Sequence, residues 1–321
     1  MSPETPSRKT ELLSADDAGI ARAAELLRQA ELVAMPTETV YGLAGDASSD
    51  TAVAGIYAAK GRPSFNPLIA HVADLDAAEA LVDIPAAARV LAQAFWPGPM
   101  TLVMPLKPGA KVSPLVTAGL PTLAIRIPGH PVARRLLKAF GGALAAPSAN
   151  PSGRISPTEP NHVLAGLSGR IAAVLDGGAC GVGVESTILA VAADGTLRLL
   201  RPGGLSAEEV QEKTGLPVLA NTATGIEAPG QMTSHYAPKG TMRLNADTVA
   251  PDEVLLGFGP VRTDWNLSPA GNLPEAAANL FRMMHGLDRA GVAKIAVSPI
   301  PETGIGLAIN DRLRRAAAPR D

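Results

Sequence analysis

Seven short stretches of this sequence gather polar side chains beside apolar segments. They are residues 36–43, 60–68, 122–128, 146–156, 183–187, Arg201 and 228–238. The first six lie next to runs that read as buried strands, whereas the last lies in a tract rich in glycine and proline. In an open α/β sheet, ligands bind at the carboxyl ends of the strands. The pattern therefore predicts a site for a polar ligand along one edge of a sheet.

The stretch 60–68 is basic. Lys60 and Arg62 flank a glycine, and prolines stiffen both sides of the turn. Lysine supplies a compact charge and arginine a planar fork, so together they suit phosphate oxygens. The same residues could instead form an ordinary solvated turn.

Arg126 stands among apolar residues in the stretch 122–128. A buried arginine needs an anion, because leaving it unpaired costs several kcal/mol. Its partner could be a carboxylate of the protein or a carboxylate of a substrate, and the sequence leaves both open.

The remaining stretches carry hydroxyl groups, amides and one aromatic group. Thr37, Glu38 and Thr39 could hold a small polar substrate or simply form a capped turn. Backbone amides in residues 146–156 could form an anion-binding nest. Tyr236 follows a methionine and a histidine inside a flexible tract, which indicates that this tract docks on something.

The common catalytic signatures are absent. The sequence has no Walker phosphate loop, no complete dinucleotide-binding fingerprint, no H-E-x-x-H motif and no nucleophile elbow. No spacing of cysteine and histidine would hold zinc, so we expect no metal bound by protein side chains.

Composition narrows the class of protein. The 321 residues carry 28 basic and 30 acidic side chains, and their mean hydropathy is +0.16, which excludes global disorder. The near-neutral charge and 3% aromatic residues argue against a dedicated nucleic-acid binder. A single cysteine, no apparent secretory signal and no long apolar run predict a cytoplasmic protein without membrane contact.

The elements that would position these stretches alternate irregularly, which predicts an α/β fold with a mixed sheet. Residues 1–13 read as a polar, poorly ordered lead-in, and Ser14 as the N-cap of a first helix. Further helices are expected at residues 51–59, 85–95, 130–140, 206–214, 274–286 and 310–318. Strands are expected at residues 32–35, 68–72, 101–106, 123–127, 143–146, 171–175, 187–191, 197–200, 253–258 and 293–298.

The composition changes after Arg201. Residues 15–205 form the expected larger domain, residues 206–239 an interdomain linker, and residues 240–321 a small α/β domain. We find no catalytic cluster in the small domain, whose most distinctive phrase is 304–312.

The order and the sequences of these stretches closely resemble the motifs of one protein family. The phrases are P-T-E-T-V-Y-G-L (36–43), K-x-R-P-x-x-N-P-L-I-x-H (60–71), W-P-G-P (96–99), P-S-A-N (147–150) and G-V-E-S-T (183–187). They resemble the YrdC-type threonylcarbamoyl-adenylate synthases, and H-Y-A-P (235–238) with the small domain resembles the two-domain branch. Met232 lies one place later than the family's linker usually has it, which puts the linker's contacts in doubt.

The resemblance implies a fold and a reaction. The fold is a twisted, mixed, open sheet with helices, followed by a small Rossmann-like domain. The reaction is that of a nucleotidyltransferase, in which ATP, L-threonine and bicarbonate give threonylcarbamoyl-AMP and pyrophosphate. Mg²⁺ would be held by ATP and water. The product would pass to the tRNA-threonylcarbamoyl transferase machinery, and this step would need no tRNA contact.

The resemblance also implies roles for residues. The threonine contacts would be Thr39, His71, Arg126 and Ser186. The ATP contacts would be Lys60, Arg62, Asn66, Thr122, Ser148, Asn150, Ser156, Arg201 and Tyr236, with Lys60 and Arg62 acting in catalysis. If Tyr236 covers the nucleotide, the linker acts as a lid that excludes water.

Two alternatives stay open. The first is a carbamoyl-adenylate-type transferase, as in hydrogenase maturation proteins, although those normally carry zinc-type cysteines. The second is an RNA-binding module with a basic concave surface, whose binding would depend steeply on salt.

Overall fold

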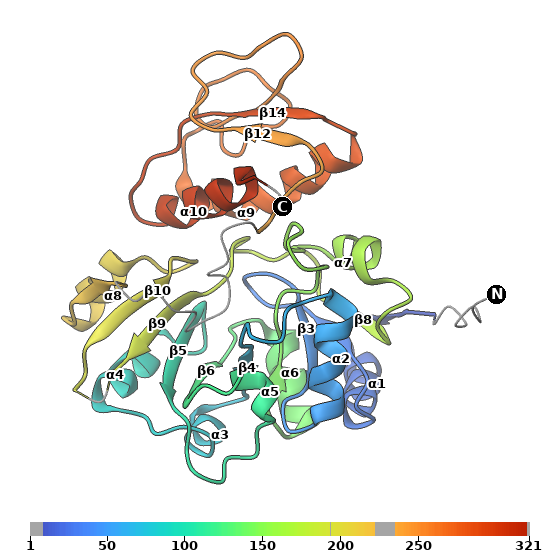
Figure 1. Ribbon diagram of the computed structural model, residues 1–321, viewed down its shortest axis with the longest axis vertical. Coiled ribbons are helices and arrows are strands. Elements are labelled where there is room, and N and C mark those ends of the chain that lie inside the picture. The colour runs from blue at the N-terminus through green and yellow to red at the C-terminus, as the bar shows by residue number, and fades with distance from the viewer. Residues whose placement is uncertain (1–8, 193, 222–234, 320–321) are drawn as a thin grey trace.

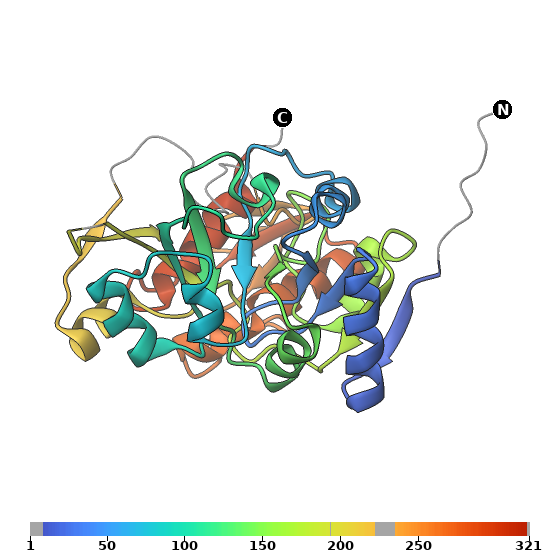
Figure 2. The ribbon, with the colours of Figure 1, turned by 90° about the horizontal axis from the view of Figure 1, so that it is seen from below.

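The computed structural model describes residues 9–192, 194–221 and 235–319 (Figure 1). Within them the expected α/β fold is confirmed. A large domain holds an 11-stranded sheet and a small C-terminal domain holds a three-stranded sheet. Seen from below, the large domain lies in front of the orange and red C-terminal elements (Figure 2).

The large sheet is mixed, as the sequence predicts. Its strand order is β1-β8-β2-β3-β7-β4-β6-β5-β9-β10-β11. The strands are β1 (Glu11–Ser14), β2 (Val33–Met35), β3 (Gly42–Asp46), β4 (Ile69–His71), β5 (Met100–Pro105), β6 (Thr122–Arg126), β7 (Leu144–Ala145), β8 (Ala173–Asp176), β9 (Thr187–Val191), β10 (Leu197–Arg201) and β11 (Val218–Ala220). Most of their residues are buried. Helices pack on both faces at the β8-β2-β3-β7 end, whereas one face of β4, β6, β5, β9 and β10 carries an apolar cluster without helix residues.

Helices of the large domain cover this sheet. They are α1 (Asp17–Arg28), α2 (Asp50–Lys60), α3 (Leu75–Glu79), α4 (Ala86–Phe95), α5 (Pro114–Thr117), α6 (Pro131–Phe140), α7 (Pro160–Leu167) and α8 (Ala207–Thr214). Local sequence sets their ends. Helix α2 begins after the Ser49 cap and ends at Gly61, whose φ of 61° is costly for other residues. Ser206 caps α8 in a capping box, as expected from the sequence.

The C-terminal domain has β12 (Thr241–Arg243), β13 (Val254–Leu256) and β14 (Lys294–Val297), all parallel in the order β12-β14-β13. Its helices are α9 (Leu273–Arg289) and α10 (Gly306–Ala317). This is the Rossmann-like arrangement that the resemblance implies. Both helices lie between the small sheet and the large domain (Figure 1). The C-terminal domain therefore presents helices, not strands, to its neighbour.

Two expectations at the N-terminus are wrong. Residues 11–13 belong to strand β1, which pairs in parallel with β8 at the sheet edge. Ser14 ends that strand, so it cannot cap α1. Asp16 is the cap, and its side chain accepts a hydrogen bond from the Gly19 amide at 2.8 Å.

The sequence analysis also overlooked several short elements, β3, α3, α5, α7, β11 and β12. They are too brief or too polar to show a clear period. The terminal helix begins at Gly306, four residues before the predicted start. No helix in the described parts of the chain is long and apolar enough to cross a membrane.

Candidate active site

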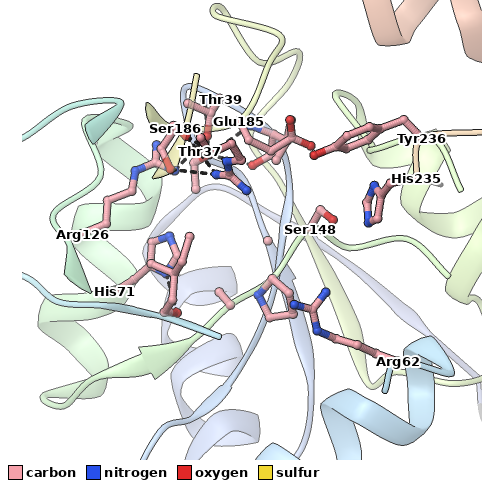
Figure 3. Close-up of a pocket in the computed structure, with 16 residues that line it drawn as sticks. Thr37, Thr39, Arg62, His71, Arg126, Ser148, Glu185, Ser186, His235 and Tyr236 are labelled. Atoms are coloured by element: carbon pink, nitrogen blue, oxygen red, sulfur yellow. Dashed lines mark hydrogen bonds between the residues drawn. The ribbon is translucent and has the colours of Figure 1, made fainter. Parts of the chain in front are cut away.

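A pocket with about 560 Å³ of empty space opens where several loops of the large sheet meet residues 235–236 (Figure 3). Eight of the predicted site residues line it: Thr39, Arg62, His71, Arg126, Ser148, Ser186, Arg201 and Tyr236. They come from segments that are more than 190 residues apart, so the fold brings them together.

Strand pairing places two of these residues side by side. Strands β4 and β6 are parallel neighbours, and their register pairs His71 with Arg126. Arg126 is buried and forms an ion pair with Glu38, with Nη2 and Oε1 2.7 Å apart. Its Nη1 donates to Thr39 Oγ1 at 2.9 Å. The partner that the sequence left open therefore includes a carboxylate of the protein.

This contact changes the chemistry of its neighbours. Burial alone raises the pKa of Glu38, but the Arg126 charge and hydrogen bonds outweigh it and lower the pKa. Burial, with the Arg126 charge, lowers the pKa of His71 to about 3. At neutral pH the pocket wall therefore presents a neutral imidazole beside a neutralised ion pair.

Hydroxyl groups continue this wall. Thr37 Oγ1 and Thr39 Oγ1 lie 2.8 Å apart, and the Thr37 hydroxyl donates to the Val40 carbonyl. Beside them, Ser186 Oγ lies 2.8 Å from Thr101 Oγ1 (Figure 3). Such hydroxyls can turn to donate or accept, which suits a small ligand with amine and hydroxyl groups.

The opposite part of the pocket is basic. Arg201 adjoins the hydroxyl wall, since its Nη2 donates to the Ser186 carbonyl at 2.9 Å and to Ser186 Oγ at 3.2 Å. Arg62 Nη2 donates to the Pro67 carbonyl at 3.0 Å. Burial, the largest cause, lowers the pKa of Arg62 to about 10, and the Arg201 charge contributes. Both guanidiniums still carry charge at neutral pH, so this part favours an anion.

Glu185 lies within this basic region. Its Oε1 accepts a hydrogen bond from Ser156 Oγ at 2.6 Å. Its Oε2 lies 3.0 Å from Arg312 Nε, on helix α10 of the C-terminal domain. Burial raises the pKa of Glu185, but the charges of Arg312 and Arg201 outweigh it and lower the pKa.

Tyr236 closes one side of the pocket. Its ring packs against Phe281 of α9, with centroids 5.4 Å apart, and its hydroxyl points toward Glu185 (Figure 3). Burial raises the pKa of Tyr236 to about 12, so the phenol is neutral. The predicted lid also includes residues 228–234, with Met232, which lie outside the described residues.

Five predicted residues do not line this pocket. Lys60 is buried, and its ammonium donates to the carbonyls of Ser148 and Asn150, each at 2.5 Å. Ser156 lies behind Glu185, as described above. The other three are Asn66, buried beside Arg62; Thr122, half-buried at the start of β6; and Asn150, which lines a second cavity near α7. The predicted contacts of these five residues with ATP stay predictions.

The sequence analysis missed roles for Glu38, Glu185 and Arg312. Both glutamates lie inside the polar stretches that it singled out. Glu38 was considered only as a substrate contact, not as the partner of Arg126, and Glu185 received no role. Arg312 lies in the stretch 304–312, for which the sequence left both packing and a second ligand site open. Asp311, Arg314 and Arg315 neighbour it in α10, so no local pattern distinguishes it as the buried charge.

The described residues contain no group of three or more histidine, cysteine, aspartate or glutamate side chains that could hold a metal ion. The thiol of Cys180 is buried, and burial raises its pKa to about 12. It is therefore unsuited to act as a nucleophile.

Comparisons with known proteins agree across the chain. A family model described as "Telomere recombination" matches residues 25–203, and one described as "Threonylcarbamoyl-AMP synthase, C-terminal domain" matches residues 205–318. The chain is 41% identical to a threonylcarbamoyl-AMP synthase of Bacillus subtilis, over 97% of this chain and 96% of that one. A threonylcarbamoyl-AMP synthase of Pyrococcus abyssi is 38% identical, with coverages of 93% and 94%.

Solved structures agree. The crystal structure of P. abyssi Sua5 complexed with L-threonine matches with a TM-score of 0.87 and 36% identity, over 96% of this chain and 98% of that one. Full-length HypF in its phosphate- and nucleotide-bound form is only 19% identical, with a TM-score of 0.53 over 59% of this chain. This second likeness shows the fold alone.

Proposed function

Because the chain belongs to the threonylcarbamoyl-AMP synthase family, we propose that it makes L-threonylcarbamoyl-AMP and pyrophosphate from L-threonine, bicarbonate and ATP. The observation that carries this proposal is the division of one pocket into two parts. One part has hydroxyls, a neutral imidazole and Arg126, and the other has two arginines beside Ser148 and Tyr236. A small amino acid and a polyphosphate need these two environments.

Threonine occupies the part around Arg126. Its carboxylate approaches the guanidinium, and Thr39 and Ser186 meet its amine and hydroxyl groups. Neutral His71 supports this arrangement, because an imidazolium beside Arg126 would add repulsion. A P. abyssi Sua5 structure was determined with L-threonine, which supports the same substrate here.

ATP occupies the basic part. Arg62 and Arg201 face the phosphates, and Tyr236 covers the nucleotide. Lys60 contributes by fixing the loop that carries Ser148, since its ammonium binds two carbonyls of that loop. Asn66, Thr122, Asn150 and Ser156 complete the nucleotide contacts when the substrate is bound.

The chemistry needs no covalent enzyme intermediate. The threonine amine and bicarbonate combine to a carbamate with loss of water. A carbamate oxygen then attacks the α-phosphorus of ATP, and the bond to the β-phosphate oxygen breaks, which releases pyrophosphate. The protein contributes by holding both substrates in place and by stabilising charge on the phosphates.

Mg²⁺ accompanies ATP, with phosphate oxygens and water as its ligands. That fits a pocket whose carboxylates Glu38 and Glu185 are both engaged by arginines. The reaction takes place in the cytoplasm, where a lone free cysteine is ordinary. The product then passes to the machinery that transfers the threonylcarbamoyl group to tRNA.

Pyrophosphate release tests this function. The purified protein is supplied with ATP, Mg²⁺, bicarbonate and one amino acid at a time. We expect release only when bicarbonate and threonine are both present. Arg126→Ala should abolish it and Lys60→Ala should reduce it strongly. Arg135→Ala is the control, because the contacts of Arg135 with Asp17 and with the Ala15 carbonyl are exposed.

Two results would contradict the proposal. Release without a threonine requirement would indicate another carbamoyl-adenylate chemistry. No release under any condition, together with tRNA binding that weakens steeply with salt, would indicate an RNA-binding module.

A further inference from the structure

The C-terminal domain touches the loop that carries Glu185. Gly183, two residues earlier, adopts a φ of 80°, and a Cβ there would lie 2.3 Å from the Ala277 carbonyl oxygen of α9. Only glycine allows this approach. The backbone that leads into Glu185 and Ser186 is therefore packed directly on a helix of the other domain.

Apolar contacts also join the C-terminal domain to two other segments of the large domain that lie next to the pocket. The hydrophobic core of the C-terminal domain extends to Val40, Ile155 and Val184 of the large domain. Each of these residues directly precedes or follows Thr39, Ser156 or Glu185 in the chain. His285 of α9 also lies 3.1 Å from the Ser156 carbonyl oxygen, through its Nε2 atom.

Arg312 joins a charge of the C-terminal domain to a charge of the large domain inside the protein. Its side chain is fully buried. Nε pairs with Glu185 Oε2 at 3.0 Å, and Nη1 donates to the Pro202 carbonyl at 2.5 Å. The guanidinium also lies near the Tyr236 ring, 5.6 Å from its centroid. One side chain of the C-terminal domain thus contacts three segments around the basic part of the pocket.

The negative charge of Glu185 makes its contact with Arg312 matter for ligand binding. Glu185 lines the pocket and faces the region of Arg62 and Arg201. A free carboxylate there would repel a polyphosphate and would compete for the arginines. Arg312 offsets that charge from behind, and Ser156 holds the second carboxylate oxygen.

From these contacts we propose that Arg312 is a positioning residue of the nucleotide site. It holds and neutralises Glu185, so that docking of the C-terminal domain is required for ATP to bind tightly. Threonine binding around Arg126 does not depend on the charge of Arg312, because the Arg126–Glu38 ion pair lies wholly within the large domain. The inference rests on the proposed function only for the identity of the polyphosphate.

Titration calorimetry with ATP and Mg²⁺, and separately with L-threonine, tests the inference in the full chain. For Arg312→Gln we expect the dissociation constant of ATP to rise on the order of tenfold, a typical size for coupling between sites. The constant for threonine should stay within about twofold. Arg312→Lys, which keeps the charge but loses the fork, should fall between wild type and Arg312→Gln.

A second replacement separates charge from packing. In Glu185→Gln/Arg312→Gln the carboxylate is gone, so ATP affinity should recover toward the wild-type value. This double variant also serves if Arg312→Gln does not fold, because it removes both members of the buried pair, and Asp311 keeps its ion pair with Arg315. Arg314→Gln is the matched control on the same helix, since Arg314 pairs only with the exposed Glu302.

Arg312→Gln that folds and binds ATP as the wild type does would overturn the inference. So would equal losses of ATP and threonine affinity that the double variant does not reverse. These outcomes differ from failure of the proposed function, which would be a wild-type protein that releases no pyrophosphate.

Discussion

Two buried ion pairs flank the same pocket, and they are built differently. Arg126 and Glu38 both belong to the large domain, where strand register and the loop after β2 bring them together. Arg312 and Glu185 belong to different domains and are 127 residues apart in the chain. The first pair forms once the large sheet has folded. The second forms only when α10 docks, so one part of the pocket depends on assembly of the whole chain.

The difference explains why a small domain without a catalytic cluster accompanies the larger one. It supplies no group to the lining of the pocket, yet it packs on residues next to Thr39, Ser156 and Glu185. Binding sites between domains are common because both surfaces can be adjusted. Here the second surface supports residues of the first.

The largest expected effect comes from the pair inside the large domain. Arg126→Ala removes a donor to Thr39 and leaves the half-buried Glu38 without its counter-charge. We expect pyrophosphate release to fall at least about a hundredfold, since removing one positioned donor typically costs that much. Stability should fall by about 3–5 kcal/mol, as for other broken buried pairs. A urea titration of Arg126→Ala and the control Arg135→Ala measures it, and equal midpoints would contradict this account.

A smaller effect is expected where the two domains approach most closely. Gly183→Ala places a Cβ against the backbone of α9 and strains a residue with positive φ. We expect a loss of more than about 1 kcal/mol in the free energy of unfolding, and weaker ATP binding.

Gly181→Ala is the control for that experiment, because a Cβ at position 181 would meet nothing within 4 Å. Its stability should stay within about 0.5 kcal/mol of wild type. If the two variants proved equally stable, the close contact would have no energetic role.

The pH dependence of stability tests the part of the pocket around Arg126, where His71 is buried. The pKa of His71 is about 3 in the folded protein, below the value of about 6.5 expected when unfolded. The unfolded chain therefore takes up this proton first, and stability falls as the pH drops from about 6.5 toward 3.

His71→Asn should flatten that slope by up to about 1.4 kcal/mol per pH unit. Urea midpoints between pH 4 and 7 measure it. Part of the slope should persist, because burial also lowers the pKa of His162 and His235 to about 3. An unchanged slope would mean that His71 is not the neutral, buried group described here.

Much of the fold could be predicted from the sequence. For the site, the loops that meet at the pocket could be predicted, but the partners of its charged residues could not. Apolar runs gave most strands of the large sheet, and Ser206 marked the start of α8. Strand β1 could not be predicted, since a polar four-residue strand at an edge owes its existence to pairing with β8. The polar stretches predicted which loops meet at the pocket, because strand ends gather at one edge of a sheet.

The partners of the buried charges could not be predicted. The sequence required an anion for Arg126 but gave no reason to choose Glu38 over a substrate. It gave even less for Arg312, whose partner lies in another domain. Lys60 illustrates the same limit, since its residue type suggested phosphate binding, while its ammonium holds the carbonyls of Ser148 and Asn150. Contacts between distant segments depend on tertiary packing, which local patterns do not encode.

The most direct test of the two-part pocket measures the binding of both ligands to a variant of each ion pair. Dissociation constants for L-threonine and for ATP with Mg²⁺ are determined for Arg126→Ala and Arg312→Gln in the full chain. We expect Arg126→Ala to weaken threonine binding and largely spare ATP, and Arg312→Gln to do the reverse. If each variant weakened both ligands equally, the division of the pocket into a self-contained part and a part supported by the C-terminal domain would be wrong.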